Sequence, residues 1–392
     1  MKFNQWTLGL AAVGAVSLAS AVRADEAKLS ALNTAISNTT ISGYVDVAAQ
    51  YNGGNPGKTP STLGFQPLGL NSGKVDSFTV NNVVISLDKP LDESPWASGY
   101  HVDLNWGTDA IAGLTAGSPL RQGYVAIRTP VGNGIDWKVG LFDGITGYES
   151  NTGYANPNYT RSYGYQINPA SEAGILASYK VVDGVSIQVG MANRGATYAG
   201  TAFNKNPLPA NQGSVGLSSK DYIAAVALTA PNSWGFLKGS TLNLGTVQGF
   251  DNGAVNNYNA SATFNTPVAG LKFGLSYDNG QTLTQLGGIG PDYSWDLNIY
   301  GIYATYQATD KLSLSVRGEY VDASGTYSFK GINCPNLQEI TATVQYDLWA
   351  NVVSRLEFRW DHFEHSNGGV TAFNASQTES AFLVALNLVY KF

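Results

Sequence analysis

The sequence predicts an all-β protein: a transmembrane antiparallel β-barrel of about 16 strands, with short periplasmic turns and long extracellular loops. Three observations predict it. Apolar and polar residues alternate with a period of two along most of the chain after residue 39, as in strands with one lipid-facing and one polar face. The connections between these segments are alternately mostly short and mostly long. The last segment has an unbroken apolar face that ends on Phe392.

Composition narrows the classes of protein. Only 13% of the 392 residues are charged, against about 25% in ordinary soluble domains, whereas 43% are hydrophobic. The 22 basic and 28 acidic residues give a net charge of −6. This argues against nucleic-acid partners, because nucleic-acid binding needs a basic face. A single cysteine excludes a disulfide framework and a cysteine-based zinc site, and we expect no metal and no cofactor.

The first 24 residues are expected to be a secretory signal peptide. Lys2 precedes an apolar run from Leu8 to Leu18, and small residues follow. Ala21 and Ala24 are alternative last residues of the signal. The apolar run is too short to span a membrane. Removal of residues 1–24 leaves 20 basic and 28 acidic residues, a net charge of −8.

The mature chain then divides into a short helix and sixteen strands. Residues 25–39 are expected to form a short helical periplasmic segment, because Leu29, Leu32 and Ile36 lie on one helical face. Residues 40–392 are expected to form the barrel. Its strands are expected to begin near Thr40, Phe78, Gly99, Arg121, Ile135, Ala173, Val185, Asp221, Thr241, Asn257, Leu271, Ser294, Leu312, Leu337, Val352 and Glu379.

Three of these strands, the second, fourth and twelfth, alternate least regularly. In the twelfth, Ile299 and Tyr300 belong to apolar series of opposite parity, which predicts a β-bulge between them.

Connection lengths predict the orientation of the barrel. Turns such as 131–134 and 183–184 are short, whereas loops such as 143–169 and 193–219 are long. Outer-membrane barrels have short periplasmic turns and long outer loops, and a soluble sandwich would not sort its loops by side so regularly. Aromatic residues near strand ends are expected to form two girdles at the headgroup level: Tyr100, Trp106, Tyr124, Trp137, Tyr179, Tyr222, Tyr258, Tyr277, Tyr320, Tyr346, Trp360 and Tyr390.

The C-terminal strand is expected to carry an assembly signal in Tyr390 and Phe392. From Phe382 onward every second residue is apolar, and the chain stops on an aromatic ring. This ending resembles the signal that the barrel-assembly machinery reads in outer-membrane proteins. Outer-membrane lipids and that machinery are therefore expected partners, and the bacterial outer membrane is the expected location.

Four stretches of the sequence are distinctive. They are NNVVISLDKPL at 81–91, YVAIRTPVGNGIDWKVG at 124–140, GYE at 147–149 and NPNYTRSYGY at 156–165. Together they resemble the putative β-barrel porin type 2 (OmpL-like) family of Gram-negative outer membranes. The resemblance is clearest over residues 81–179 and continues as architecture to the C-terminus. It implies a porin-like barrel, and it implies no particular solute.

The long connection after the fifth strand is the third outer loop when both termini are periplasmic. In general porins that loop folds inward and narrows the pore. Here it carries one cation, one carboxylate and five phenols, which suit a constriction with a transverse field and hydrogen-bonding walls: Tyr148, Glu149, Tyr154, Tyr159, Arg161, Tyr163 and Tyr165. The alternative is that the tyrosines only pack the loop onto the barrel wall.

Charged residues on the polar parity of the strands are expected to line the pore, because a charge on the lipid face costs about 2–4 kcal/mol at mid-bilayer. They also fit salt bridges that stiffen the wall. Basic and acidic members nearly balance, so we expect weak ion selectivity, set by Arg161 and Glu149 at the narrowest point. The expected pore-lining charges are Arg128, Asp136, Lys138, Arg317, Glu319, Arg355, Glu357, Arg359 and Asp361.

Enzymatic patterns are weak, and no catalytic residues are expected. His101 lies two residues before Asp103, but no serine completes a triad, and His362 and His365 do not form a helical zinc motif. We expect a porin, a water-filled channel for passive diffusion of small hydrophilic solutes or ions, since sixteen strands leave a wet lumen. An outer-membrane barrel enzyme of the lipase or protease type and a structural or adhesive barrel are the alternatives. A homotrimer is expected by analogy with general porins.

Overall fold

The computed structural model describes residues 38–53, 74, 76–110, 118–193, 220–249, 255–284, 293–322, 336–364 and 380–392. The expected signal peptide and residues 25–37 of the expected helical segment lie outside these ranges. Within them, no helix is long and apolar enough to cross a membrane.

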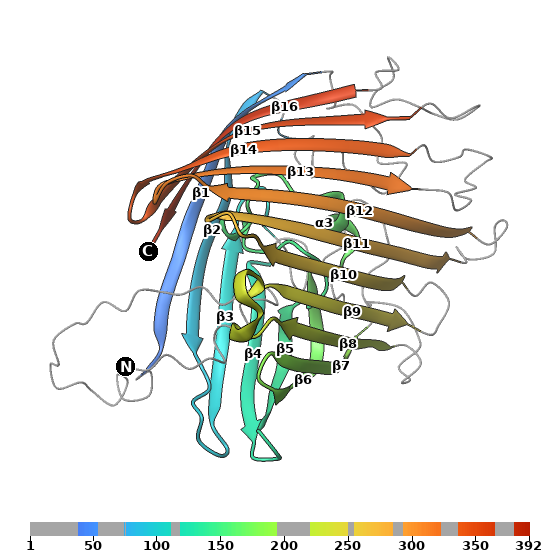
Figure 1. Ribbon diagram of the computed structural model, residues 1–392. Coiled ribbons are helices and arrows are strands. Elements are labelled where there is room, and N and C mark those ends of the chain that lie inside the picture. Colours follow the sequence, from blue (N-terminus) through green and yellow to red (C-terminus); the bar gives the residue numbers. More distant parts are fainter. Residues whose placement is uncertain are drawn as a thin grey trace, which may run out of the picture.

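The described residues form sixteen strands in one closed antiparallel barrel, in which each strand pairs with its neighbours in sequence and β1 pairs with β16 (Figure 1). Each expected strand start lies within two residues of an observed one. The strands are β1 (Thr40–Gly53), β2 (Ser77–Lys89), β3 (Ser98–Trp106), β4 (Leu120–Thr129), β5 (Ile135–Asp143), β6 (Ser171–Val182), β7 (Val185–Asn193), β8 (Lys220–Thr229), β9 (Thr241–Gly249), β10 (Val255–Asn265), β11 (Leu271–Thr284), β12 (Tyr293–Gln307), β13 (Leu312–Asp322), β14 (Leu337–Trp349), β15 (Val352–Phe363) and β16 (Ser380–Lys391).

The period-two pattern separates an outer apolar face from an inner polar face. In β15, Leu356 and Phe358 are 53% and 48% exposed on the outside. The residues between and beside them, Arg355, Glu357 and Arg359, are at most 1% exposed inside the barrel. Successive side chains of a strand point to opposite faces, so one sequence pattern supplies both the lipid contact and the lumen wall.

Two β-bulges turn additional polar side chains inward. Between β3 and β4 the register passes from Gln122 opposite Asp103 to Leu120 opposite Leu104, which leaves Arg121 without an opposite residue. Arg121 and Gln122 are therefore both inside, at 1% and 4% exposure. Between β1 and β2 the register skips Asn81 in the same way, and a bulge of this kind re-aims a side chain.

The bulge expected in β12 is wrong. The register of this strand with β11 and with β13 runs without a shift between Ile299 and Tyr300. Tyr300 is 49% exposed on the outside, whereas Leu297 and Ile299 point inward and are 6% and 0% exposed. These two side chains belong to an apolar cluster inside the barrel, so they break the alternation without breaking the register.

One of the aromatic residues expected in the girdles faces the lumen. Tyr124 shares the inner face of β4 with Gln122 and stacks on His101, with ring centroids 5.4 Å apart. The neighbouring Val125 and Ile127 are on the outer face and exposed. Outward aromatic residues at strand ends do occur elsewhere, for example Trp106, Tyr258 and Tyr390, each 43–48% exposed.

Candidate functional site

The connection between β5 and β6, residues 144–170, lies inside the barrel and is called here the third loop. It contains the 3-10 turn η2 (Gly153–Ala155) and the short helix α3 (Tyr163–Ile167). Ser162 caps α3 by accepting a hydrogen bond from the Tyr165 backbone N–H at 2.9 Å. α3 is buried and packs against β11 and β12 (Figure 1). Because those strands lie nearly opposite β5 and β6 in a sixteen-stranded ring, the loop crosses the lumen.

Two carboxylates of the barrel wall hold the backbone of the third loop. Glu357 accepts hydrogen bonds from the backbone N–H groups of Tyr159 and Thr160 at 2.5 and 2.8 Å. Glu319 accepts from those of Tyr163 and Gly164 at 2.7 and 3.0 Å. Buried backbone N–H groups need partners, and these two side chains supply them for four loop residues.

Wall arginines hold the loop in the complementary way. Arg317 donates to the Thr160 carbonyl at 2.8 Å and to the Glu149 carboxylate at 2.7 Å. Arg359 donates to the Arg161 carbonyl at 2.6 Å. Arg355 donates through one nitrogen to three loop carbonyls, each at 3.2 Å: those of Gly153, Asn156 and Asn158.

The third loop covers many of the strand charges, which the alternation of the strands did not predict. All of those on β13 and β15 point into the barrel, but the loop covers them and leaves them 0–5% exposed. They contact the loop and one another rather than lumen water: Arg317, Glu319, Arg355, Glu357, Arg359 and Asp361.

The remaining expected charges lie on β4 and β5. Arg128 and Asp136 form a two-bond pair at 2.6 and 2.7 Å near the periplasmic ends of these strands. Lys138 lies inside, 4.8 Å from the ring centre of Tyr124.

Two of the five loop tyrosines belong to the apolar cluster inside the barrel. Tyr159 and Tyr163 pack there with Leu297 and Ile299. The Tyr163 hydroxyl donates to Asp361 at 2.9 Å. Burial raises the pKa of this phenol well above its usual value, so it remains a neutral donor.

The other three phenols border a cavity. Tyr148 stacks on Tyr303 with ring centroids 4.0 Å apart, and it lies so close to Gly274 that a Cβ there would overlap its hydroxyl. Tyr154 meets Tyr44 edge to face at 4.8 Å. The Arg161 guanidinium lies over the ring of Tyr165, with its Cζ atom 4.5 Å from the ring centre.

The two charged residues of the loop differ in their surroundings. Glu149 is buried. Its charge is compensated there by the pair with Arg317 and by a hydrogen bond from the Ser162 backbone N–H at 2.9 Å. Arg161 is half-buried and donates to the carbonyls of Ser150 and Asn151 at 2.5 and 2.7 Å. No ion pair joins Arg161 to a carboxylate among the described residues.

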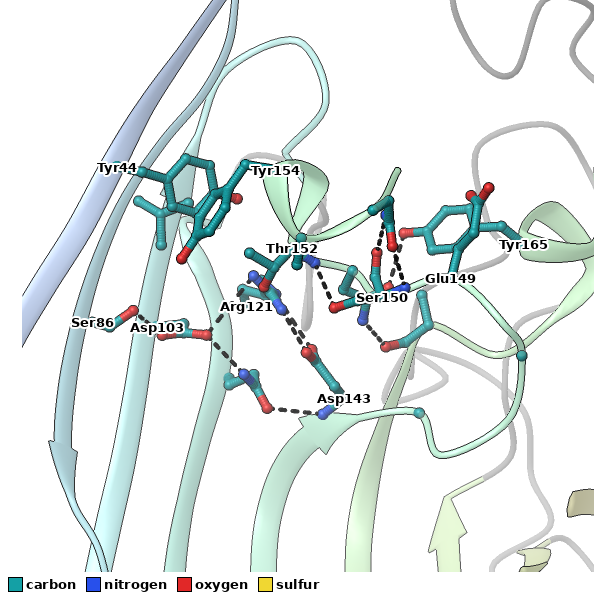
Figure 2. Close-up of a pocket in the computed structure, with 18 of the residues that line it drawn as sticks. Tyr44, Ser86, Asp103, Arg121, Asp143, Glu149, Ser150, Thr152, Tyr154 and Tyr165 are labelled. Carbon is teal, nitrogen blue, oxygen red and sulfur yellow. Dashed lines mark hydrogen bonds and ion pairs between the residues drawn. The ribbon is translucent and has the colours of Figure 1, made fainter. Parts of the chain in front are cut away.

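The cavity beside the third loop measures about 1300 Å³. It reaches Thr40 and Lys391 at the periplasmic strand ends, so it lies on the periplasmic side of the loop. Figure 2 shows one of its walls, where Asp103, Arg121 and Asp143 follow one another below Tyr44 and Tyr154 of the lining. The wall formed by β9 and β10 is mostly uncharged and carries hydroxyl and amide groups: Thr241, Asn243, Ser261, Thr263 and Asn265.

Sequence reasoning missed Arg121 as a lumen residue. By simple alternation it belongs to the outer face with Val125 and Ile127, and only the bulge turns it inward. Its guanidinium binds Asp143 through Nε at 3.3 Å and Nη2 at 2.5 Å. The irregular alternation of this strand was the one available signal, and it did not specify which residue is turned.

The family model described as putative beta-barrel porin-2, OmpL-like, matches residues 38–392. The chain belongs to this family. The resemblance seen in the sequence is thereby confirmed, and with it the outer-membrane location and the porin function. A search of curated protein sequences finds no match for this porin.

Solved structures share the fold of this porin. The outer membrane channel DcaP of Acinetobacter baumannii aligns with a TM-score of 0.60 at 11% identity, over 90% of this chain and 97% of that one. An anion-selective porin from Comamonas acidovorans gives 0.55 at 12%, over 90% and 99%. OmpT of Vibrio cholerae gives 0.54 at 14%, over 90% and 97%. At these identities the likeness shows the barrel alone, and it confirms the predicted fold class.

Proposed function

We propose that this porin is a passive channel for small hydrophilic solutes, that its third loop forms the constriction, and that it catalyses no reaction. The supporting observation is the loop itself, which crosses the lumen and is bonded to β13 and β15 on the far side. A cavity of about 1300 Å³ with polar walls remains beside it. A water-filled lumen is the expected state of a sixteen-stranded barrel.

Within this proposal the loop residues have two roles: some border the path of the solute, and some position the loop. Tyr148, Glu149, Tyr154 and Tyr165 line the cavity and so border the path of the solute. Tyr159, Tyr163 and Glu149 set the position of the loop, because they are buried against the wall. The strand charges beneath the loop act on the solute mainly by fixing the loop.

A barrel enzyme is the alternative that His101 raises. His101 lies 3.0 Å from Asp103 and 2.9 Å from Asp88. Ser86 is close, but its hydroxyl donates to Asp103 at 2.5 Å. A serine nucleophile has to bond to the histidine that removes its proton, so this arrangement does not favour hydrolysis. A His101→Ala variant with unchanged conductance and no lost hydrolytic activity would agree with a channel.

We also propose that the porin assembles as a homotrimer in contact with outer-membrane lipids. One of the similar structures, OmpT of Vibrio cholerae, is described as a trimer form. Native mass measurement of the detergent-extracted porin tests the subunit number, and a monomer would contradict it. Delivery by the barrel-assembly machinery remains the proposal that Tyr390 and Phe392 support.

Planar-bilayer recording tests the channel. We expect stepwise conductance from the purified porin, and a larger step when residues 152–158 of the third loop are deleted. The matched control deletes residues 200–206 of the next outer loop, which lies outside the described ranges, and should leave the step nearly unchanged. Absence of steps in the full-length porin would contradict a channel, and equal steps in both deletions would contradict the constriction.

A further inference from the structure

Only two of the three guanidinium nitrogens of Arg121 make hydrogen bonds to described residues. Nε and Nη2 bind Asp143, whereas Nη1 makes no hydrogen bond to any described residue. The Asp103 Oδ2 atom lies 3.9 Å from Nη1, which is beyond hydrogen-bond distance. Both atoms belong to residues that line the cavity (Figure 2).

Asp103 is held firmly in this position. Its Oδ1 accepts from the Ser86 hydroxyl at 2.5 Å and lies 3.0 Å from His101 Nε2. Its Oδ2 accepts from Gln122 at 2.7 Å. The gap between donor and acceptor is therefore fixed by surrounding bonds and does not close by side-chain rotation.

A gap of this width matches one bridging oxygen atom. An oxygen about 2.8 Å from both Nη1 and Oδ2 forms two hydrogen bonds of ordinary length. A hydroxyl group satisfies both, because it accepts from Nη1 and donates to the carboxylate. A carboxylate would be repelled by Asp103 and Asp143, and an ammonium group by Arg121, so a neutral hydroxyl fits best.

The surroundings fit the rest of a hydroxylated molecule. Tyr154, packed edge to face on the buried Tyr44, presents its ring beside the gap (Figure 2), and the C–H face of a sugar ring packs well on an aromatic face. Across the cavity, Thr241, Asn243 and Thr263 supply uncharged donors and acceptors.

We propose that Arg121 and Asp103 form a binding subsite for uncharged polyhydroxylated solutes of monosaccharide size. The proposal rests on the channel function proposed above and names the solute class of that channel. It also assigns a purpose to the bulge in β4, which brings the Arg121 side chain from the outer face of the barrel into the cavity.

The test is the effect of glucose on the ion current of single channels in planar bilayers. We expect the current to fall saturably with glucose concentration. In Arg121→Lys, which keeps the charge but lacks Nη1, the half-saturating concentration should rise at least about tenfold, as for loss of a hydrogen bond to a charged group. Asp103→Asn should weaken saturation as well. The matched control is Arg128→Lys, outside the cavity lining, which should behave as wild type.

Three results would overturn the proposal. They are a current that falls only in proportion to viscosity, equal saturation in wild type and Arg121→Lys, and saturation by the anion gluconate at the same concentrations as glucose. Heat-modifiable migration of each variant on gels establishes that it is folded. If the wild type forms no channels at all, the channel function fails; if it forms channels that ignore glucose, only the subsite fails.

Discussion

Arg317 of β13 and Glu149 of the third loop, 168 residues apart in sequence, form a 2.7 Å ion pair in which neither side chain is more than 1% exposed. Arg317 also donates to Glu339 at 3.0 Å, so one guanidinium joins the loop to two strands. Loss of one member of a buried pair leaves an uncompensated charge and costs about 3–5 kcal/mol. The loop is therefore fixed to the barrel wall by a buried ion pair.

The first prediction concerns this guanidinium. Arg317→Ala leaves Glu149, Glu319 and Glu339 without it, so their mutual repulsion should displace the loop. We expect a higher and noisier single-channel conductance, and unfolding of the barrel on gels at a lower temperature. Arg128→Ala removes a guanidinium whose pair lies near the periplasmic strand ends and is the control. Unchanged conductance and stability in Arg317→Ala would show that the loop is held by other contacts.

The second prediction concerns the backbone of the loop. Glu357→Gln replaces one acceptor oxygen by a donor, so one of the N–H groups of Tyr159 and Thr160 loses its partner. The expected loss is about 1.5–3 kcal/mol, as for a hydrogen bond to a charged group. We expect increased current noise at an almost unchanged mean conductance. Glu364→Gln, near the outer end of β15, changes the same group outside the loop contacts and should leave the noise as in wild type.

The third prediction concerns ion selectivity. Arg161 is the cation of the third loop, it pairs with no carboxylate among the described residues, and its guanidinium lies over the ring of Tyr165, which lines the cavity. Arg161→Glu should shift the reversal potential toward cations much more than Lys205→Glu, an equal charge change in the connection of residues 193–219 that the sequence predicts to be the next outer loop, because a charge outside the pore is screened over about 8 Å. Equal shifts for the two variants would exclude the third loop as the selective element.

The fourth prediction concerns closure of the barrel. The backbones of Phe392 and Gly43 exchange two hydrogen bonds, both 3.0 Å, and the Phe392 ring occupies the space that a Cβ on Gly43 would need. Deletion of Phe392, or Phe392→Asp, should reduce the amount of heat-modifiable porin in outer-membrane fractions and yield periplasmic fragments. Lys391→Gln is the control. Assembly of the Phe392 variants at the wild-type level would contradict an assembly signal at this residue.

Most of the fold was predictable because a membrane barrel imposes one rule on every strand. A residue such as Phe358 has to face lipid and its neighbour Glu357 has to face inward, so alternation locates both. The rule fails where the pairing slips by one residue, as at Arg121, because a bulge depends on both strands and leaves little trace in either. It also misled at Ile299, where an inward apolar side chain packs against the loop rather than marking an irregular strand.

The arrangement of the site was less predictable than its residues. Alternation correctly directed Arg317 and Glu319 inward, but it contains no information about what covers them. Their partners are backbone groups of a loop 156–157 residues earlier, and such contacts have no local sequence signature. The composition of the loop indicated a constriction, whereas which of its tyrosines are buried depends on how the loop crosses the lumen.

Glu319 and Glu357 hold the third loop by accepting hydrogen bonds from its backbone N–H groups. Such N–H groups are present whatever side chains the loop carries. These backbone bonds therefore do not depend on the side chains of the loop, unlike the pair of Glu149 with Arg317. Tyr148, Tyr154 and Tyr165 could therefore be exchanged for other residues while the loop stays where it is. The barrel can therefore keep its structure while substitutions at a few loop positions change the solute preference of the constriction.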